Sequence, residues 1–146
     1  MVDININVEG LEQAVNKLKT MPDKLDSAMK KSMDASMLTL WENVPPYPAP
    51  PETSSYVRTG TLGRSLGSGA GGGRASAVPT VYSVTGTGMN IQGTFGTNLS
   101  YAKYVIDPDR QAYMHKGRWW TMRTIRDKAI NKINKLWLEF VRVVLK

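Results

Sequence analysis

Apolar and polar residues alternate over residues 2–8, and the pattern then changes to a helical one. Strict alternation predicts a strand with one solvated face. Beyond Gly10, apolar residues recur at helical spacing over residues 11–18 and again from Leu25 to Trp41. Pro22 and the following aspartate suit the first turn of that second helix. We therefore expect one strand and two helices within residues 1–42.

Methionines lie four residues apart along the second predicted helix, at Met29, Met33 and Met37. This spacing places them on one face. Methionine is flexible and fills irregular apolar space, so the stripe favours a core or a contact between subunits over a cofactor site. If the stripe is partly exposed, it offers an adaptable apolar contact.

Two segments in the middle of the chain lack a regular pattern. Five prolines fall within residues 43–57, which predicts an extended, stiff loop. Residues 67–73 are rich in glycine and are expected to form a mobile hairpin, or a loop that is ordered only in an assembly. A phosphate-binding loop is disfavoured, because Arg74 leads towards a predicted strand and no Gly-Lys-Ser/Thr sequence precedes a helix.

The rest of the chain predicts short strands followed by one long helix. Residues 58–62 suggest a glycine turn that enters a short apolar strand or turn, and strands are expected near 78–84, 89–95 and 101–106. A long apolar stripe predicts a C-terminal helix over residues 118–145. The expected class is α+β in a single domain, 1–146, with the N-terminal helices and the C-terminal helix packed on a short-stranded antiparallel β-meander formed by residues 58–106.

Composition narrows the possible chemistry. The 146 residues include no cysteine and one histidine, so disulfides, thiol catalysis and multi-histidine metal sites are excluded. No apolar run is long enough to span a membrane. His115 lies in a polar, basic connector and is expected to be a surface or hydrogen-bonded residue. Ser65 is not surrounded by the Gly-x-Ser-x-Gly sequence of a nucleophile elbow, and its side chain is expected to hydrogen-bond to the backbone of its own turn. We expect no enzyme activity, no catalytic residue, no cofactor and no metal.

The net charge of +7 lies entirely in the last part of the chain. Residues 103–146 hold eleven basic and four acidic residues, whereas residues 1–102 hold eight of each. Such a basic face suits an acidic protein neighbour or DNA. The candidate contacts on the C-terminal helix are Arg123, Arg126, Lys128, Lys132 and Lys135. A small basic nucleic-acid-binding protein is therefore an alternative, although these residues could also serve only to keep the helix soluble.

Other candidate residues are structural or interfacial. Gly60 is expected to allow a turn that a side chain would disfavour, and Leu62 and Leu66 to tether that turn to the core. On a strand, Tyr101 and Tyr104 would lie on opposite faces, with one buried and one available for contact. The last helix is expected to be anchored by Trp120 and Trp137.

Four motifs occur in an order that resembles a known family. Pro51 is followed by Thr59-Gly60-Thr61-Leu62-Gly63-Arg64-Ser65, then Tyr101-Ala102-Lys103-Tyr104-Val105, then Trp119-Trp120-Thr121-Met122-Arg123. This set resembles the HK97 gp10-like family of phage tail-completion and head–tail joining proteins. The similarity covers most of the chain.

The resemblance implies a virion structural protein rather than an enzyme. Such a protein would be assembled in the host cytoplasm and would form a homo-oligomeric ring, expected to be a hexamer, at the neck of the tail. Its expected partners are the tail tube or tail terminator protein and the head-closure or connector protein. DNA passing through the channel is a further possible partner, and a membrane is not.

Overall fold

The computed structural model describes residues 1–7, 22–55, 57–69, 72–74 and 78–144. The helix predicted over residues 11–18 lies outside this range. The described elements follow the chain as β1 (Val2–Asn7), α2 (Pro22–Glu42), α3 (Thr61–Ser65), β2 (Val81–Thr85), the 3₁₀ turn η1 (Gly88–Asn90), β3 (Gln92–Thr97), α4 (Ala102–Val105), the 3₁₀ turn η2 (Tyr113–His115) and α5 (Met122–Val144).

The three strands form one antiparallel sheet in the order β1-β3-β2. Strands β2 and β3 form a hairpin, in which Tyr82 pairs with Phe95, and β1 pairs along the other side of β3, where Ile4 faces Phe95. The α+β class predicted from the sequence is confirmed, since helices and this small antiparallel sheet make up the fold. The sheet takes its third strand from the N-terminus.

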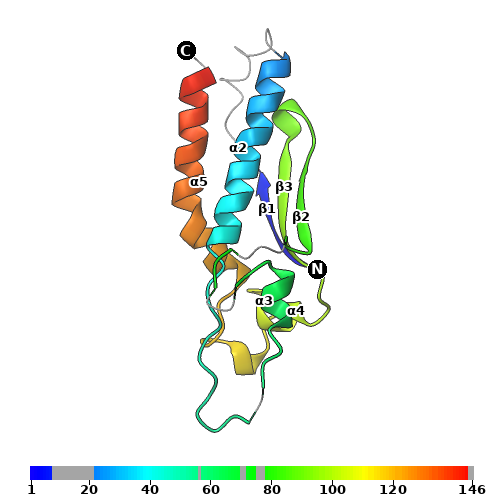
Figure 1. Cartoon of the computed structure of the whole chain (residues 1–146), viewed down its shortest axis with the longest axis vertical. Coiled ribbons are helices and arrows are strands. Elements are labelled where there is room, and N and C mark those ends of the chain that lie inside the picture. The colour runs from blue at the N-terminus through cyan, green and yellow to red at the C-terminus, as the bar shows by residue number, and fades with distance from the viewer. Residues whose placement is uncertain (8–21, 56, 70–71, 75–77, 145–146) are drawn as a thin grey trace.

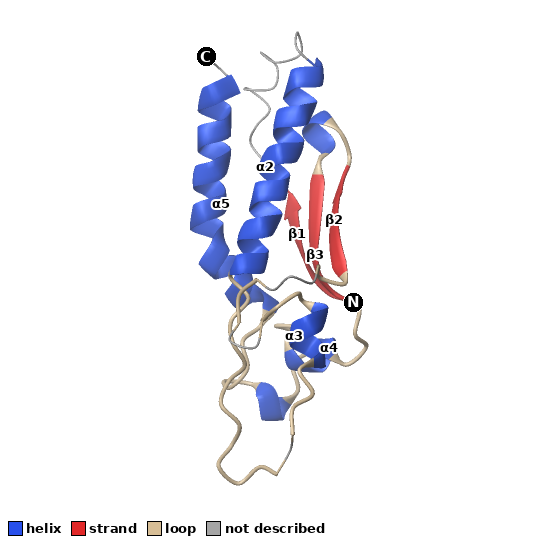
Figure 2. Cartoon of the chain, viewed as in Figure 1, coloured by secondary structure: helices blue, strands red, loops and turns tan. Residues whose placement is uncertain are grey.

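Helices α2 and α5 run antiparallel, parallel to the long axis of the molecule and in the part that carries the sheet, and α2 lies between α5 and the sheet (Figures 1 and 2). Met29, Met33 and Met37 are at most 1% exposed in the resulting core. Gly93 of β3 makes this packing possible, because a Cβ atom there would lie 2.6 Å from the sulfur of Met37. The methionine stripe is therefore core, and its use as a partly exposed subunit contact is wrong for this structure.

The C-terminal helix was predicted over residues 118–145, and α5 begins later, at Met122, with its apolar stripe facing the core. Met122, Ile125, Ala129, Ile133 and Trp137 are all buried. The indole of Trp137 also donates a hydrogen bond of 3.0 Å from Nε1 to Oγ of Ser36 on α2. Burial together with this bond makes Trp137 the anchor of α5 that the sequence suggested.

Residues 102–105 form the helix α4, so the predicted tyrosine strand over residues 101–106 is wrong. Ala102 begins α4 and is fully buried, as is Ile106 just after it. The two positions are i and i+4, which places both side chains on one face of a helix. The amide of Ile106 donates to the carbonyl of Ala102 at 2.8 Å. Tyr101 and Tyr104 are consequently both exposed, by 42% and 52%, rather than one buried and one free.

Beyond the predicted glycine turn, residues 61–65 form the short helix α3, where the sequence suggested a short strand or turn. Gly60 precedes it with φ of 71°, in the left-handed region, which confirms the expected role of this glycine. Leu62 and Leu66 are buried in the core, as predicted. Ser65 donates from Oγ to the carbonyl of Leu62 at 2.7 Å, and it accepts a bond from Thr97 of β3 at 2.7 Å. The segment therefore fastens α3 to the sheet.

The described part of the glycine-rich segment closes against the end of α2. Ser68 and Arg74 form an isolated antiparallel bridge, in agreement with the expected hairpin. Trp41 donates from Nε1 to the carbonyl of Gly67 at 2.8 Å, and the guanidinium of Arg74 lies 4.9 Å from the Trp41 ring centroid. A Cβ atom at Gly72 would lie 2.4 Å from the backbone nitrogen of Pro46, so only glycine fits this approach.

Candidate functional site

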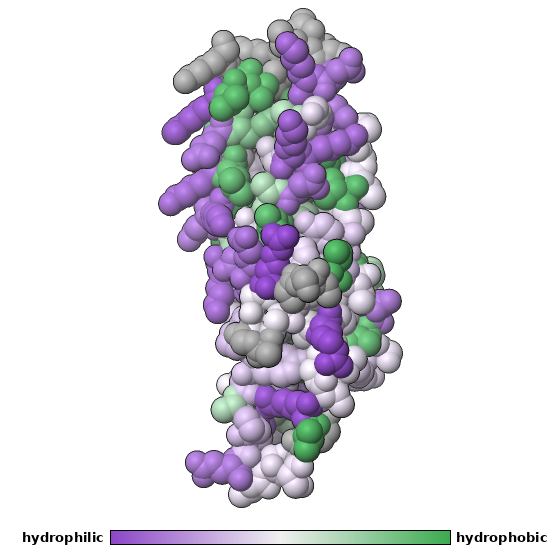
Figure 3. Space-filling model, viewed as in Figure 1, coloured by the Kyte–Doolittle hydropathy of each residue, from purple (hydrophilic) through white to green (hydrophobic). Residues whose placement is uncertain are grey.

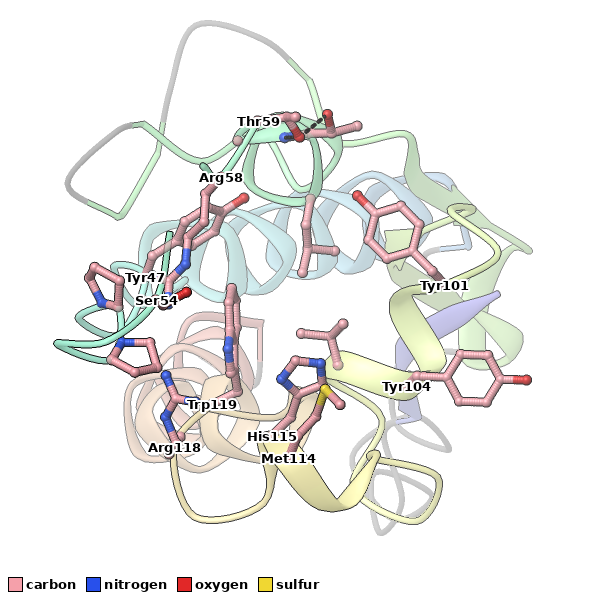
Figure 4. A pocket seen from close by; sticks show the side chains of 16 residues that line it. Tyr47, Ser54, Arg58, Thr59, Tyr101, Tyr104, Met114, His115, Arg118 and Trp119 are labelled. Carbon is pink, nitrogen blue, oxygen red and sulfur yellow. Dashed lines mark hydrogen bonds between the residues drawn. The ribbon is translucent and has the colours of Figure 1, made fainter. Parts of the chain in front are cut away.

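A pocket of about 490 Å³ lies at the end of the molecule that carries α3, α4 and η2 (Figures 1 and 4). Four segments form its walls, the first two close in the sequence and the other two far from them. They are Tyr47, Pro50, Pro51 and Ser54 of the proline-rich segment, residues 58–62 around Gly60, residues of α4 with the tyrosine before it, and residues within 114–119 before α5. Pockets of this size commonly accommodate ligands.

In one wall, Arg58 lies against two neighbouring aromatic rings. Its guanidinium carbon lies 5.1 Å from the ring centroid of Trp119 and 5.9 Å from that of Tyr47. The two rings lie 5.1 Å apart, and Arg58 also donates from Nη1 to the carbonyl of Pro48. Cation–π contacts and this hydrogen bond hold the guanidinium in place.

Further hydrogen bonds fix the frame around this wall. The Tyr47 hydroxyl accepts a bond from the amide of Gly63, which joins the proline-rich segment to α3. Gln111 is buried and donates from Nε2 to the carbonyls of Val105 and Trp119, at 2.7 and 3.2 Å. The connector between α4 and α5 is thus tied to both of its ends, and the pocket is largely preformed.

Trp120 also joins the connector to the proline-rich segment. Its Nε1 donates to the carbonyl of Pro46 at 3.0 Å, and its ring lies 6.2 Å from that of Trp119. Trp120 is half-buried and lies just before α5. It therefore anchors the start of α5, as the sequence suggested, but it does so against the proline-rich segment.

The opposite wall is formed by α4 and its preceding turn. Figure 4 shows the ring of Tyr101 directed into the pocket and that of Tyr104 directed away from it. Lys103 lies 5.0 Å from the Tyr104 ring centroid. The aromatic strand proposed from the sequence thus becomes a helical wall with one tyrosine facing inwards.

The pocket is cationic. Arg58 and Arg118 line it together with His115, and none of the described residues lining it is acidic. Partial burial, with the nearby charges of Arg118 and Arg58, lowers the pKa of His115 below 6.5. The imidazole lies edge-on to Trp119 at 6.0 Å, and its buried Nδ1 has no hydrogen-bond partner among the described residues. The site favours anionic groups next to apolar ones.

The structure brings some predicted residues together and separates others. Gly60, Leu62, Tyr101 and Tyr104 all line the pocket, whereas Leu66, Trp137 and the methionines lie in the core. Sequence reasoning missed the combination of Tyr47, Arg58, Arg118 and Trp119. Basic and aromatic residues are interleaved between positions 110 and 123, which was the available signal, but the contribution from positions 47 and 58 could not be inferred from spacing.

The basic residues of α5 form a separate surface. Lys128, Lys132 and Lys135 are exposed on one face of the helix, and hydrophilic side chains follow the edge of the molecule where α5 lies (Figure 3). Lys132 lies 3.3 Å from Glu42, and Arg126 pairs with Asp127 at 2.8 Å. Arg123 lies 3.6 Å from Asp109. Only some of the predicted cations therefore lack an ion-pair partner among the described residues.

Two further observations concern the described part of the chain. No group of three or more His, Asp or Glu side chains there is arranged to hold a metal ion. None of its helices is long and apolar enough to cross a membrane.

Comparison of the chain with protein-family models, curated proteins and solved structures finds no match.

Proposed function

We propose that this protein is a structural subunit of a tailed-phage virion that joins the tail to the head as part of a ring, without catalysis. The proposal rests on the ordered motifs that resemble those of tail-completion proteins and on the two edge strands of the sheet. Its proposed location is the neck of the tail. Its proposed neighbours are further copies of itself, the tail tube or tail terminator protein, and the head-closure protein.

The observation that carries the ring is the presence of two unlike sheet edges. Strand β3 is central, and neither β1 nor β2 pairs with a further strand among the described residues. Unpaired edges can bond to strands of another molecule. If β2 of one copy meets β1 of the next, the interface joins two different surfaces, and repetition of such a contact closes into a ring when the rotation permits.

The open face of the sheet is polar, which suits a contact made at the strand edges rather than through this face. Asn5 of β1 accepts hydrogen bonds at its Oδ1 from Gln92 at 3.1 Å and from Thr94 at 3.0 Å. Ser83 of β2 is exposed and pairs with Thr94 across the hairpin. A lysine at position 83 would place a charge on the open face of the edge strand β2, beside the edge where a further strand would pair, without entering the core.

The test is the mass of the purified protein, alone and mixed with phage tails that lack this component. We expect a discrete ring or binding to the tails. Ser83→Lys should reduce either form of assembly, whereas Thr87→Lys, at an exposed position beyond the end of β2, should not. A protein that remains monomeric and ignores the tails would overturn the proposal.

Binding to nucleic acid is a second candidate, favoured by the exposed lysine face of α5. Lys128 and Lys135 have no ion-pair partner among the described residues, and they share this face with Lys132. Phosphate contacts release counterions, so DNA binding should weaken steeply with salt and with reversal of these three charges. Tight binding that persists at physiological salt would favour this function over the first.

A further inference from the structure

The pocket beside Arg58 has the properties of a binding site rather than of a packing defect. Its walls come from four separate segments, and hydrogen bonds from Tyr47, Arg58 and Gln111 side chains hold these segments in register. Pockets that bind ligands combine apolar walls with a few placed polar or charged groups. This one is about 490 Å³ and carries two guanidinium groups.

The charge of the pocket has no internal counterpart. Neither Arg58 nor Arg118 forms an ion pair with any described residue, although Arg58 is half-buried and fixed against Tyr47 and Trp119. Figure 4 shows both arginines on the same side of the pocket. A guanidinium binds a carboxylate through charge-assisted hydrogen bonds, which are stronger than those between neutral groups.

The other walls are apolar or aromatic. Leu62, Val105 and the ring of Trp119 line the pocket, and the ring of Tyr101 is directed into it. Arginine, tryptophan and tyrosine are the residues that most often dominate the energy of protein interfaces. A ligand that fits would therefore carry a carboxylate close to an aromatic or large aliphatic side chain.

We propose that this pocket binds a segment of a partner protein that presents a carboxylate next to an aromatic or aliphatic side chain. The choice of a protein segment over a free metabolite rests on the proposed assembly function. The carboxylate lies between Arg58 and Arg118, and the apolar side chain packs on Trp119 and Leu62. Tyr47, Pro50 and Pro51 form the outer wall, where the partner's segment enters.

The test uses a pair of small probes that differ by one charge. N-acetyl-phenylalanine carries the carboxylate and the ring, whereas N-acetyl-phenylalanine amide has the same shape without the charge. Binding is followed by the ¹H–¹⁵N NMR signal of the Trp119 indole, assigned with a Trp119→Phe chain. We expect the acid to move this signal and to bind about 5-fold more tightly than the amide.

Arg118→Gln provides the matched variant, because Arg118 is exposed and no hydrogen bond or ion pair of the described structure depends on its side chain. It should weaken binding of the acid by about 5-fold and leave binding of the amide unchanged. Arg110→Gln removes an equal charge from the same connector outside the pocket and should change neither. Unfolding curves of both variants verify that the fold is retained.

Several results would overturn the proposal. They are equal binding of acid and amide, equal effects of the two arginine variants, signal changes away from the pocket, or no binding at millimolar probe. Tighter binding of inorganic phosphate than of the acid would assign the site to phosphates instead. A chain that binds the acid but never assembles would refute the ring and retain a carboxylate pocket. A chain that assembles but does not bind the acid would retain the ring and refute the carboxylate pocket.

Discussion

Substitution of Gly96 by alanine tests how β1 is held in the sheet. A Cβ atom at position 96 would lie 2.3 Å from the carbonyl oxygen of Val2 and 2.7 Å from the Cα atom of Asp3. Both atoms belong to the backbone of β1, which pairs with β3 at this point. Because neither can rotate away, β1 must shift from its register or detach.

The expected loss of stability follows from what β1 buries. Val2 and Ile4 are 5% and 8% exposed in the core, and each apolar side chain of this size contributes roughly 1.5–3 kcal/mol when buried. Overpacking by itself lowers the free energy of unfolding by about 1–3 kcal/mol. Replacing glycine by alanine also restricts the unfolded chain, which raises the free energy of unfolding by about 0.4–1 kcal/mol. We expect Gly96→Ala to lower the free energy of unfolding by about 3 kcal/mol, a large share of the roughly 5–15 kcal/mol typical of a domain.

Gly93→Ala is the matched control on the same strand. Its Cβ atom would lie 2.6 and 2.9 Å from the sulfur atoms of Met37 and Met33, which are flexible side chains that can repack. We expect a loss of about 1 kcal/mol. Urea denaturation followed by circular dichroism measures both variants. If Gly96→Ala is no more destabilising than Gly93→Ala, the close approach of β1 is not what makes Gly96 necessary.

Three other predictions concern α3 and the pocket. Ser65→Ala should lower the free energy of unfolding by about 1–3 kcal/mol, because the buried Thr97 hydroxyl loses its acceptor; a smaller loss in the Ser65→Ala chain than in Thr97→Val would contradict this. Gly60→Ala should cost about 1–2 kcal/mol at its φ of 71°, measured by thermal unfolding, and an unchanged midpoint would rule out the left-handed turn. The lowered pKa of His115 means that the unfolded chain binds more protons just below pH 6.5, so stability should rise with pH up to 6.5 and then level off. Since the sequence has no other histidine, His115→Gln should remove this rise, and a profile that stays the same would refute it.

The sequence alone determined two kinds of feature. One is the element with a long apolar pattern, and the other is the single residue whose type suits one backbone conformation. Helix α5 is 23 residues long, and five residues at helical spacing along it are buried, from Met122 to Trp137. Alternation in β1 and the helical spacing of the methionines in α2 were also sufficient to predict those elements. Gly60 was recognised because few other residues adopt a left-handed turn. These features depend on contacts between near neighbours in the chain.

The tertiary structure decided which short segments are helices and which residues meet. Residues 101–105 are too few for periodicity to separate a strand from a helix, and the burial of Ala102 and Ile106 selected the helix. The pocket depends on the packing of Tyr47 and Arg58 against Trp119, and Trp119 lies more than fifty residues after both of them in the sequence. No local pattern encodes such a meeting, because it results from where α2, α3 and α5 pack around the common core.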